Sequence, residues 1–310
     1  MRTPFLLLIF LFLYSCSEPN SNSKNKDTPT TGEITVACDE SLLPIMQAEQ
    51  MVFKELYPNA KINMVYLSEY DAIQLMLKDS ARLAIITREL NASEISVLNE
   101  QKISNAKYHK IGYDAVAFVL NPANVDTSFS LKQIKGLLSG EITDWSQISS
   151  ISKLGKIQVV FDSPKSGSIR LLQDSVLKGS PLGKNCFALK NNPEVIDYVQ
   201  KNKNAIGIIG VSWISDTDDV QAKGFLSNLK VADIEPILMR AAGINNKPMQ
   251  GNIALKQYPY WRQIKVASRE MRSGLGTGFA SFMESEPGQK ILLKGGLVPF
   301  RSSIRTINLN

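Results

Sequence analysis

Small hydroxyl residues stand at several points where a predicted strand leads into a predicted helix. The first turn of a helix exposes unpaired backbone N–H groups and a partial positive charge. A serine or threonine there adds a hydroxyl donor, so the junction can hold an anion without a lysine. The strongest candidate is Ser166-Gly167-Ser168, where glycine lets a ligand approach the backbone, and the others are Ser41, Ser68 and Thr87. Each alone is an ordinary N-cap, but four such junctions at the strand ends of one α/β chain favour a ligand site.

The groups that enzymes most often use for proton transfer are scarce in this chain. His109 is the only histidine, and no serine lies in a Gly-x-Ser-x-Gly nucleophile elbow. Ser150 and Ser175 each stand three residues before a lysine, but the Ser-Asp-Asn and Lys-Thr-Gly elements of acyl-serine enzymes are missing. Cysteine and histidine do not cluster with zinc spacing, and glycine-rich nucleotide fingerprints are absent. We therefore expect a binding protein without a metal or cofactor, not an enzyme.

The elements that position these residues alternate from Gly32 onward. The sequence predicts strands over 33–38, 62–67, 83–87, 107–120, 157–161, 205–209 and 264–267. It predicts helices from Ser41 to before Pro58, and over 73–77, 130–140, 169–177, 193–200 and 285–295. Strands that alternate with helices in this way indicate an α/β fold with parallel sheets.

Length and composition exclude several classes of protein. The 310 residues are 44% hydrophobic and 21% charged, which suits a globular protein of roughly two domains. The 35 basic and 29 acidic residues give a net charge of +6. These charges are scattered and form no basic cluster with aromatic residues, so we do not expect a nucleic-acid partner. No apolar run reaches the ~20 residues that span a bilayer.

The N-terminus has the pattern of an export signal. Arg2 gives a positive start, and Phe5–Leu13 form a short apolar core. Leu13-Tyr14-Ser15-Cys16 resembles the lipobox of bacterial lipoproteins, in which the cysteine is acylated. We therefore predict a signal peptide over residues 1–16, a lipid anchor at Cys16, and a flexible polar tether over 17–32. The protein would be exported and held at a membrane of the cell envelope, and Cys38 and Cys186 would remain as two buried thiols.

Four segments together resemble the substrate-binding proteins of phosphate ABC transporters. Gly140-Glu141-Ile142 through Trp145 resembles the helix-end segment of that family, and the stretch from Val159 to Arg170 resembles the strand and phosphate loop. Residues 204–210 resemble an Ala-Ile-Gly-Tyr strand, and 287–299 resemble the C-terminal helix and turn. The resemblance covers nearly everything from Gly32 to Phe300.

This resemblance implies a two-lobed type II periplasmic-binding-protein fold with a cleft between the lobes. Two strands would cross between the lobes, near 116–120 and 259–263. Lobe 1 would contain residues 33–117 plus 262–310, and lobe 2 residues 118–261. The implied function is that of a monomeric, lipid-anchored periplasmic receptor, which captures phosphate or a similar oxyanion in the cleft and delivers it to an ABC permease.

Three positions depart from the pattern of that family. Asp39-Glu40 stands where the family has Gly with Ser or Thr, Thr87-Arg88 where it has an Asp, and Asp162 where it has an Arg. The acid and the base have exchanged places. We therefore expect Arg88 and Asp162 to pair across the closed cleft, with Arg88 making the bidentate contact to the oxyanion.

Two other interpretations stay open at this point. The same fold could bind another small ligand, or serve as a sensor or adhesion lipoprotein. The less favoured one is an exported serine hydrolase or acyltransferase.

Overall fold

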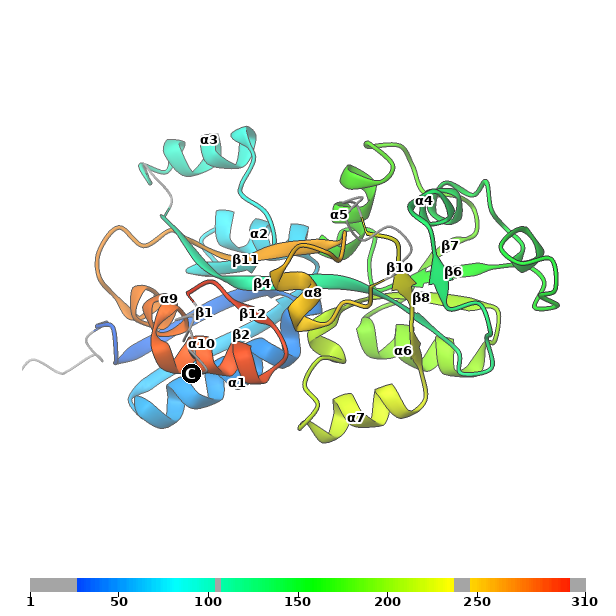
Figure 1. Ribbon diagram of the computed structural model, residues 1–310. Coiled ribbons are helices and arrows are strands. Elements are labelled where there is room, and N and C mark those ends of the chain that lie inside the picture. Colours follow the sequence, from blue (N-terminus) through cyan, green and yellow to red (C-terminus); the bar gives the residue numbers. More distant parts are fainter. Residues whose placement is uncertain (1–26, 104–106, 237–245, 302–310) are drawn as a thin grey trace, which may run out of the picture.

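A computed structural model describes residues 27–103, 107–236 and 246–301 (Figure 1). The predicted signal peptide, its Cys16 and most of the predicted tether lie outside the described residues. Among the helices of the described part, none is both long and apolar enough to span a membrane.

A curled ten-stranded sheet with the order β2-β1-β3-β11-β4-β8-β6-β7 forms the frame, and β9 and β12 also pair with β4. A separate two-stranded sheet is made by β10 and β5. The strands are β1 (Gly32–Asp39), β2 (Ala60–Leu67), β3 (Leu83–Ile86), β4 (Lys107–Leu120), β5 (Ser128–Phe129), β6 (Gln158–Phe161), β7 (Cys186–Ala188), β8 (Ala205–Gly210), β9 (Lys230–Val231), β10 (Asp233–Ile234), β11 (Trp261–Ser268) and β12 (Val298–Pro299).

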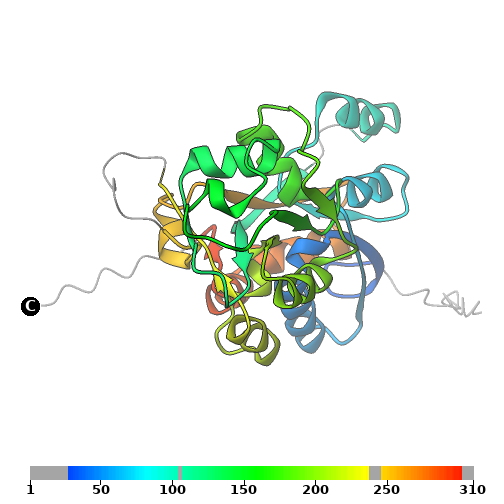
Figure 2. The same ribbon diagram turned by 90° about the vertical axis from the view of Figure 1, so that its right-hand side faces the viewer.

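The long strand β4 connects the two lobes. Its first part, up to Ala115, pairs antiparallel with β11, and its second part, from Val116, pairs antiparallel with β8. We call the part built on β2, β1, β3 and β11 the first lobe, and the part built on β8, β6 and β7 the second lobe. In Figure 1 the first lobe lies on the left and the second on the right. Figure 2, turned by 90°, looks onto the second lobe.

Helices cover the faces of both sheet regions (Figures 1 and 2). In the first lobe, α2 packs on β1 and β3, while α1, α9 and α10 pack against one another, with α9 on β1. In the second lobe, α6 packs on β8 and β6. The helices are α1 (Leu43–Leu56), α2 (Glu69–Leu77), α3 (Ala92–Glu100), α4 (Leu131–Ser139), α5 (Gly167–Ser175), α6 (Asn192–Lys201), α7 (Val220–Ser227), α8 (Gln250–Ala254), α9 (Leu275–Glu284) and α10 (Glu286–Lys294). Three short 3₁₀ turns are η1 (Glu40–Leu42), η2 (Trp145–Gln147) and η3 (Val211–Trp213).

The apolar runs of the sequence form the core of the sheet. Every residue of β3 and β8 is buried, as expected for strands with helices on both faces, which read as continuous hydrophobic runs. The helix starts follow sequence rules as well: Ser130 and Gln133 form a capping box at α4, and Ser166 caps α5. These caps fix the first turn of α5 at the carboxyl end of β6.

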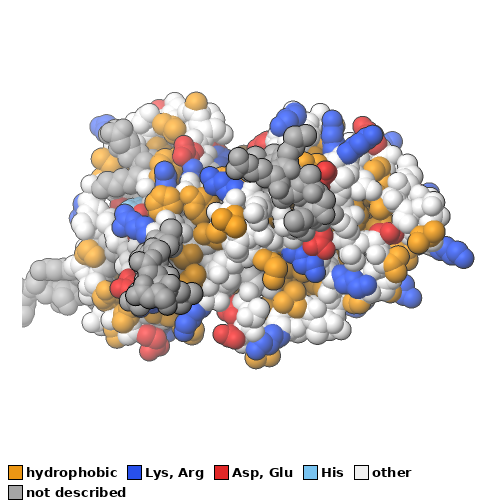
Figure 3. Space-filling view, in the orientation of Figure 1, with side chains coloured by type: hydrophobic (Ala, Val, Ile, Leu, Met, Phe, Trp, Pro, Cys, Tyr) orange, Lys and Arg blue, Asp and Glu red, His pale blue; other side chains and the backbone are white. Residues whose placement is uncertain are grey.

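Cys38 is buried and Cys186 is half-buried, and both are free thiols. On the face seen in Figure 3, the Lys and Arg side chains are spread over both lobes instead of forming one patch.

Candidate functional site

The first part of the site joins the end of β1 to the start of α5. Asp39, the last residue of β1, is fully buried. Its Oδ1 accepts hydrogen bonds from the backbone N–H (3.0 Å) and hydroxyl (2.9 Å) of Ser41. Its Oδ2 accepts one from the N–H of Gly167, the first residue of α5 (3.1 Å). A carboxylate therefore sits on the N-terminus of α5, which is where a helix binds an anion.

The second part joins the start of α2 to the end of β3 and to α5. Glu69 Oε1 accepts hydrogen bonds from the N–H (2.7 Å) and hydroxyl (2.6 Å) of Thr87. Glu69 Oε2 accepts one from Arg170 Nε, and Arg170 Nη2 lies 3.0 Å from Thr87 Oγ1. Burial opposes ionisation of Glu69, but the charge of Arg170 and these hydrogen bonds together lower the pKa of the carboxyl group.

The third part is a buried arginine on β11. Arg262 Nη2 lies 2.6 Å from Asp114 Oδ2 on β4, and both side chains are almost fully buried. The same guanidinium donates to Ser41 Oγ (2.8 Å) and to Ser168 Oγ (3.2 Å). One cation thus links β4 and β11 to the candidate hydroxyls of both lobes. We call the set Asp39, Ser41, Glu69, Thr87, Asp114, Gly167, Ser168, Arg170 and Arg262 the cleft cluster.

Burial sets the protonation of the acidic groups beside this cluster. Desolvation raises the pKa of Asp39 to about 7, although Arg262 acts in the opposite direction. Desolvation also raises the pKa of Glu40 to about 7, while hydrogen bonds from Asn192 counteract it. The pKa of Asp162 is raised by burial too. At neutral pH the region therefore holds carboxyl groups that can carry a proton.

A cavity of about 540 Å³ opens beside the cluster, between the two lobes. Glu40, Ser68 and Asp71 line it from the first lobe, and Asp162, Ser163 and Lys190 from the second. The Oδ1 atom of buried Asp162 has no hydrogen-bond partner among the described residues. Asp162 therefore brings an unused hydrogen-bond acceptor to the residues around the cavity.

The structure brings most of the sequence-predicted residues together. Ser41, Thr87, Gly167 and Ser168 belong to the cleft cluster, and Ser166 caps α5 through Ile169 N (3.3 Å). Ser68 lies at the cavity wall, where its hydroxyl is 2.7 Å from Asp71 Oδ2. Asp162 lines the same cavity.

The expected pair of Arg88 and Asp162 is not formed, and this part of the sequence prediction is wrong for the structure. Arg88 makes its bidentate contact with Glu94, Nη1–Oε2 and Nη2–Oε1 both being 2.7 Å. Its Nε also lies 3.7 Å from Glu69. The reason is local: Glu94 belongs to the capping box of α3, only six residues further on, and offers a ready carboxylate. Arg170 and Arg262 supply the cations of the cluster instead.

Sequence reasoning missed Glu69, Asp114 and Arg262 as members of the site. The available signal was a charged residue in or next to each crossing segment, because an unpaired charge in an apolar strand is costly. Arg262 lies within 259–263, and Asp114 lies just before 116–120. Arg170 was noted only as the end of the phosphate-loop resemblance. The single histidine, His109, contacts Glu284 at the end of α9 (Nδ1–Oε2 3.1 Å).

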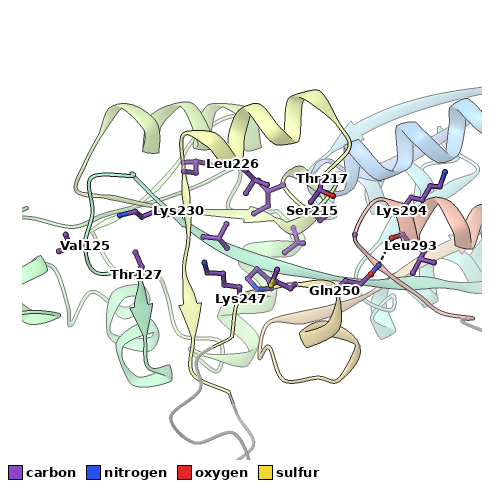
Figure 4. Close-up of a pocket in the computed structure, with 17 residues that line it drawn as sticks. Val125, Thr127, Ser215, Thr217, Leu226, Lys230, Lys247, Gln250, Leu293 and Lys294 are labelled. Carbon is purple, nitrogen blue, oxygen red and sulfur yellow. Dashed lines mark hydrogen bonds between the residues drawn. The ribbon is translucent and has the colours of Figure 1, made fainter. Parts of the chain in front are cut away.

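A larger cavity, about 800 Å³, lies elsewhere (Figure 4). Its wall is largely apolar, with Lys230, Lys247 and Lys294 among its residues, and the cleft cluster contributes none of them. Gln250 spans part of it by donating to Leu293 O (3.0 Å).

Comparisons with known proteins place this architecture among binding proteins. The phosphate-binding protein PstS of Borreliella burgdorferi is 22% identical over 309 residues, covering 96% of this chain and 99% of the relative. PstS of Bacillus subtilis is 21% identical over 281 residues, covering 90% and 85%. These relatives are named for binding, which agrees with the expectation of a non-enzymatic protein.

Solved structures share the fold. A putative phosphate ABC transporter substrate-binding protein with bound phosphate from Clostridium perfringens has a TM-score of 0.71 at 23% identity, covering 87% of this chain and all of that chain. An ABC-type phosphate transport receptor from Vibrio cholerae has a TM-score of 0.63 at 22% identity, covering 86% and 100%. The expected two-lobed α/β binding-protein fold is confirmed. A family model for the PBP superfamily domain matches residues 23–287, most of the chain, and the chain therefore belongs to the PBP superfamily.

Proposed function

We propose that this protein is the substrate-binding component of an ABC importer, and that it captures phosphate or a closely similar oxyanion in its interlobe cleft. The observation that carries the proposal is the convergence of anion-binding donors from both lobes. Ser41 and Thr87 present backbone N–H and hydroxyl groups from the first lobe, and Gly167 presents its N–H from the second. Arg170 and Arg262 add positive charge. Its relatives and structural neighbours named for phosphate support the same cargo.

The acidic groups of the cleft favour an oxyanion that carries a proton. The unpartnered Oδ1 of Asp162 can accept a hydrogen bond from a phosphate O–H group. Sulfate has no proton to give at neutral pH, so that the same carboxylate would repel it. We therefore infer selectivity for hydrogen phosphate and its analogue arsenate over sulfate.

A matched pair of arginine variants tests the site. We expect calorimetry to detect phosphate binding by the native protein, and phosphate to raise its melting temperature, because a ligand that binds only the folded state stabilises it. Arg170→Ala should weaken phosphate binding by about tenfold or more, since it removes a charged donor and leaves Glu69 without its nearest cation. Arg88→Ala should leave the affinity nearly unchanged, because Arg88 is engaged by Glu94. Equal losses in both variants, or no phosphate binding by the native protein, would contradict the proposal.

The membrane anchor is a separate part of the proposal. Acylation of Cys16 would hold the protein at an envelope membrane, and the predicted polar tether over 17–32 would allow the lobes to reach a permease. We expect the native chain to partition into detergent and to be labelled by a fatty acid. Cys16→Ala should abolish the label and release the protein into the aqueous phase, whereas Cys186→Ala should change neither. A labelled Cys16→Ala protein would rule out this anchor.

Delivery would use closure of the two lobes, here proposed as residues 33–117 plus 262–310 and residues 118–261. A permease in the membrane would contact a monomeric receptor at the tips of both lobes. Closure would surround the solute with hydrogen-bond donors and acceptors, and these groups would select the solute without covalent chemistry.

A further inference from the structure

The anion-binding donors of the cleft are already occupied by two carboxylates of the chain itself. Asp39 and Glu69 both belong to the first lobe, yet each bonds to α5 in the second. Asp39 Oδ2 accepts the N–H of Gly167 (3.1 Å), and Glu69 Oε2 accepts Arg170 Nε. These are the contacts that a bound oxyanion would make with α5.

The two carboxylates leave no room for a second anion at the same place. A Cβ on Gly167 would collide with Asp39 Oδ2, and it would lie 2.7 Å from Thr87 Oγ1 and 2.9 Å from Glu69 Oε1. Asp39 and Glu69 therefore fill the space next to the first N–H of α5 from two sides. An oxyanion can reach these donors only after at least one carboxylate has moved away.

Both carboxylates bond within the first lobe and across to the second. Asp39 Oδ1 accepts from Ser41 and Oδ2 from Gly167. Glu69 Oε1 accepts from Thr87 and also from Arg170 Nη2 (3.4 Å), and Glu69 Oε2 accepts from Arg170 Nε. Two neighbouring contacts also join the lobes. Tyr70 N donates to Lys165 O (3.2 Å), and Lys165 Nζ lies 3.0 Å from Asp71. These contacts fix the start of α2 against the second lobe.

We infer that Asp39 and Glu69 act as internal anions, which hold the lobes closed when no cargo is bound and compete with an incoming oxyanion. The competition with an oxyanion rests on the proposed function. The interlobe contacts of Asp39 and Glu69 do not, because they are the same whichever solute is the cargo. Only molecules in which the donors are free can bind phosphate. The apparent affinity is therefore the intrinsic affinity multiplied by the fraction of such molecules. Asp39 and Glu69 would therefore set the phosphate concentration at which phosphate displaces these two carboxylates from the donors of α5.

Amide substitutions separate the two roles of each carboxylate. In Asp39→Asn and Glu69→Gln, the remaining oxygen can still accept from Ser41 or Thr87, whereas the NH₂ group faces the N–H of Gly167 or Arg170. The amide NH₂ group and the N–H group of the other lobe are both donors, so that no hydrogen bond can form between them. The matched control is Asp197→Asn, which removes an exposed carboxylate that pairs with Lys201 within α6, outside the cluster and the cavity.

The experiment uses small-angle X-ray scattering and calorimetry on the full chain carrying Cys16→Ser, in phosphate-free buffer and with inorganic phosphate. We expect the parent chain to have the same radius of gyration with and without phosphate. The double variant Asp39→Asn/Glu69→Gln should be expanded without phosphate, contract when phosphate is added, and bind it at least about tenfold more tightly. Asp197→Asn should behave like the parent.

The outcomes distinguish the inference from the proposed function. A double variant that stays as compact as the parent without phosphate overturns the inference, even if both proteins bind phosphate. An expanded double variant supports the internal anions, and if neither protein then binds phosphate, only the proposed cargo is wrong. Should the double variant fail to fold, the single variants are measured by the same criterion, each with a smaller expansion expected.

Discussion

The Gly167→Ala variant is expected to lose about 100-fold in phosphate affinity while both lobes remain folded. The added Cβ would collide with Asp39 Oδ2 and lie within 3 Å of Thr87 and Glu69, all from the opposite lobe. Whatever anion occupies that space, the lobes could no longer approach to hydrogen-bond distance. Overpacking of this kind costs ~1–3 kcal/mol, and a lost hydrogen bond to a charged group adds to it.

Gly224→Ala is the matched control for this prediction. Gly224 also lies in a short helix, α7, but a Cβ added there meets no atom within 4 Å. Alanine in place of an unhindered helical glycine should be neutral or slightly stabilising. Calorimetry with phosphate and a thermal melt measure both variants. Unchanged affinity in Gly167→Ala would mean that the anion does not bind at the start of α5.

The sequence allowed the position of the site to be predicted because the topology of parallel strands is strongly constrained. Ser41, Ser68, Thr87 and Ser166 each follow a strand in the sequence, and the carboxyl ends of parallel strands meet at one edge. Hydroxyl residues at those ends therefore had to lie close together once the two lobes faced each other. The sequence predicts this helix over 169–177, whereas α5 begins at Gly167 with Ser166 as its N-cap, so the helix was located correctly but its start was placed two residues too late.

The partners of the charged residues could not be predicted in the same way, because each carboxylate had several cations within reach. Arg88 was assigned to Asp162 across the cleft, but it pairs with Glu94 in its own segment. The Asn91-x-x-Glu94 capping pattern was visible and would have indicated this closer partner. Arg262 and Asp114 are 148 residues apart. Their pairing depends on the register of β11 with β4, where Arg262 stands opposite Asp114.

The departures from the phosphate-binding pattern change the chemistry of the site more than its position in the fold. Glycine or a hydroxyl residue after β1 would leave the first N–H of α5 free, whereas Asp39 brings a carboxylate onto it. The donors that would bind an oxyanion are retained, and the chain adds its own acceptors. Under the proposed function, the affinity for phosphate would therefore depend on the balance between these internal carboxylates and the external anion, in addition to the donors.

The Arg262→Met variant is expected to have the largest effect on stability, a loss of ~3–5 kcal/mol. Arg262 is the cation for buried Asp114, and Asp39 lies in its field as well. Removing one partner of a buried pair leaves an uncompensated carboxylate, which is far more costly than losing the whole pair. The double variant Arg262→Met/Asp114→Asn should therefore recover part of the lost stability, although each substitution alone destabilises. For a chain of this size the single variant should melt ~10 °C lower.

The pH dependence provides an independent check on the same variant. Without Arg262, burial would raise the pKa of Asp114 and Asp39 further, so that the folded state would hold more protons than the unfolded state above pH 4. Stability then falls as the pH rises. The stability deficit of Arg262→Met relative to the native protein should accordingly be smaller at pH 5 than at pH 8, as measured by urea unfolding at both values. A stability deficit that is independent of pH would show that Arg262 stabilises the contact between β4 and β11 by packing, and not by neutralising Asp114 and Asp39.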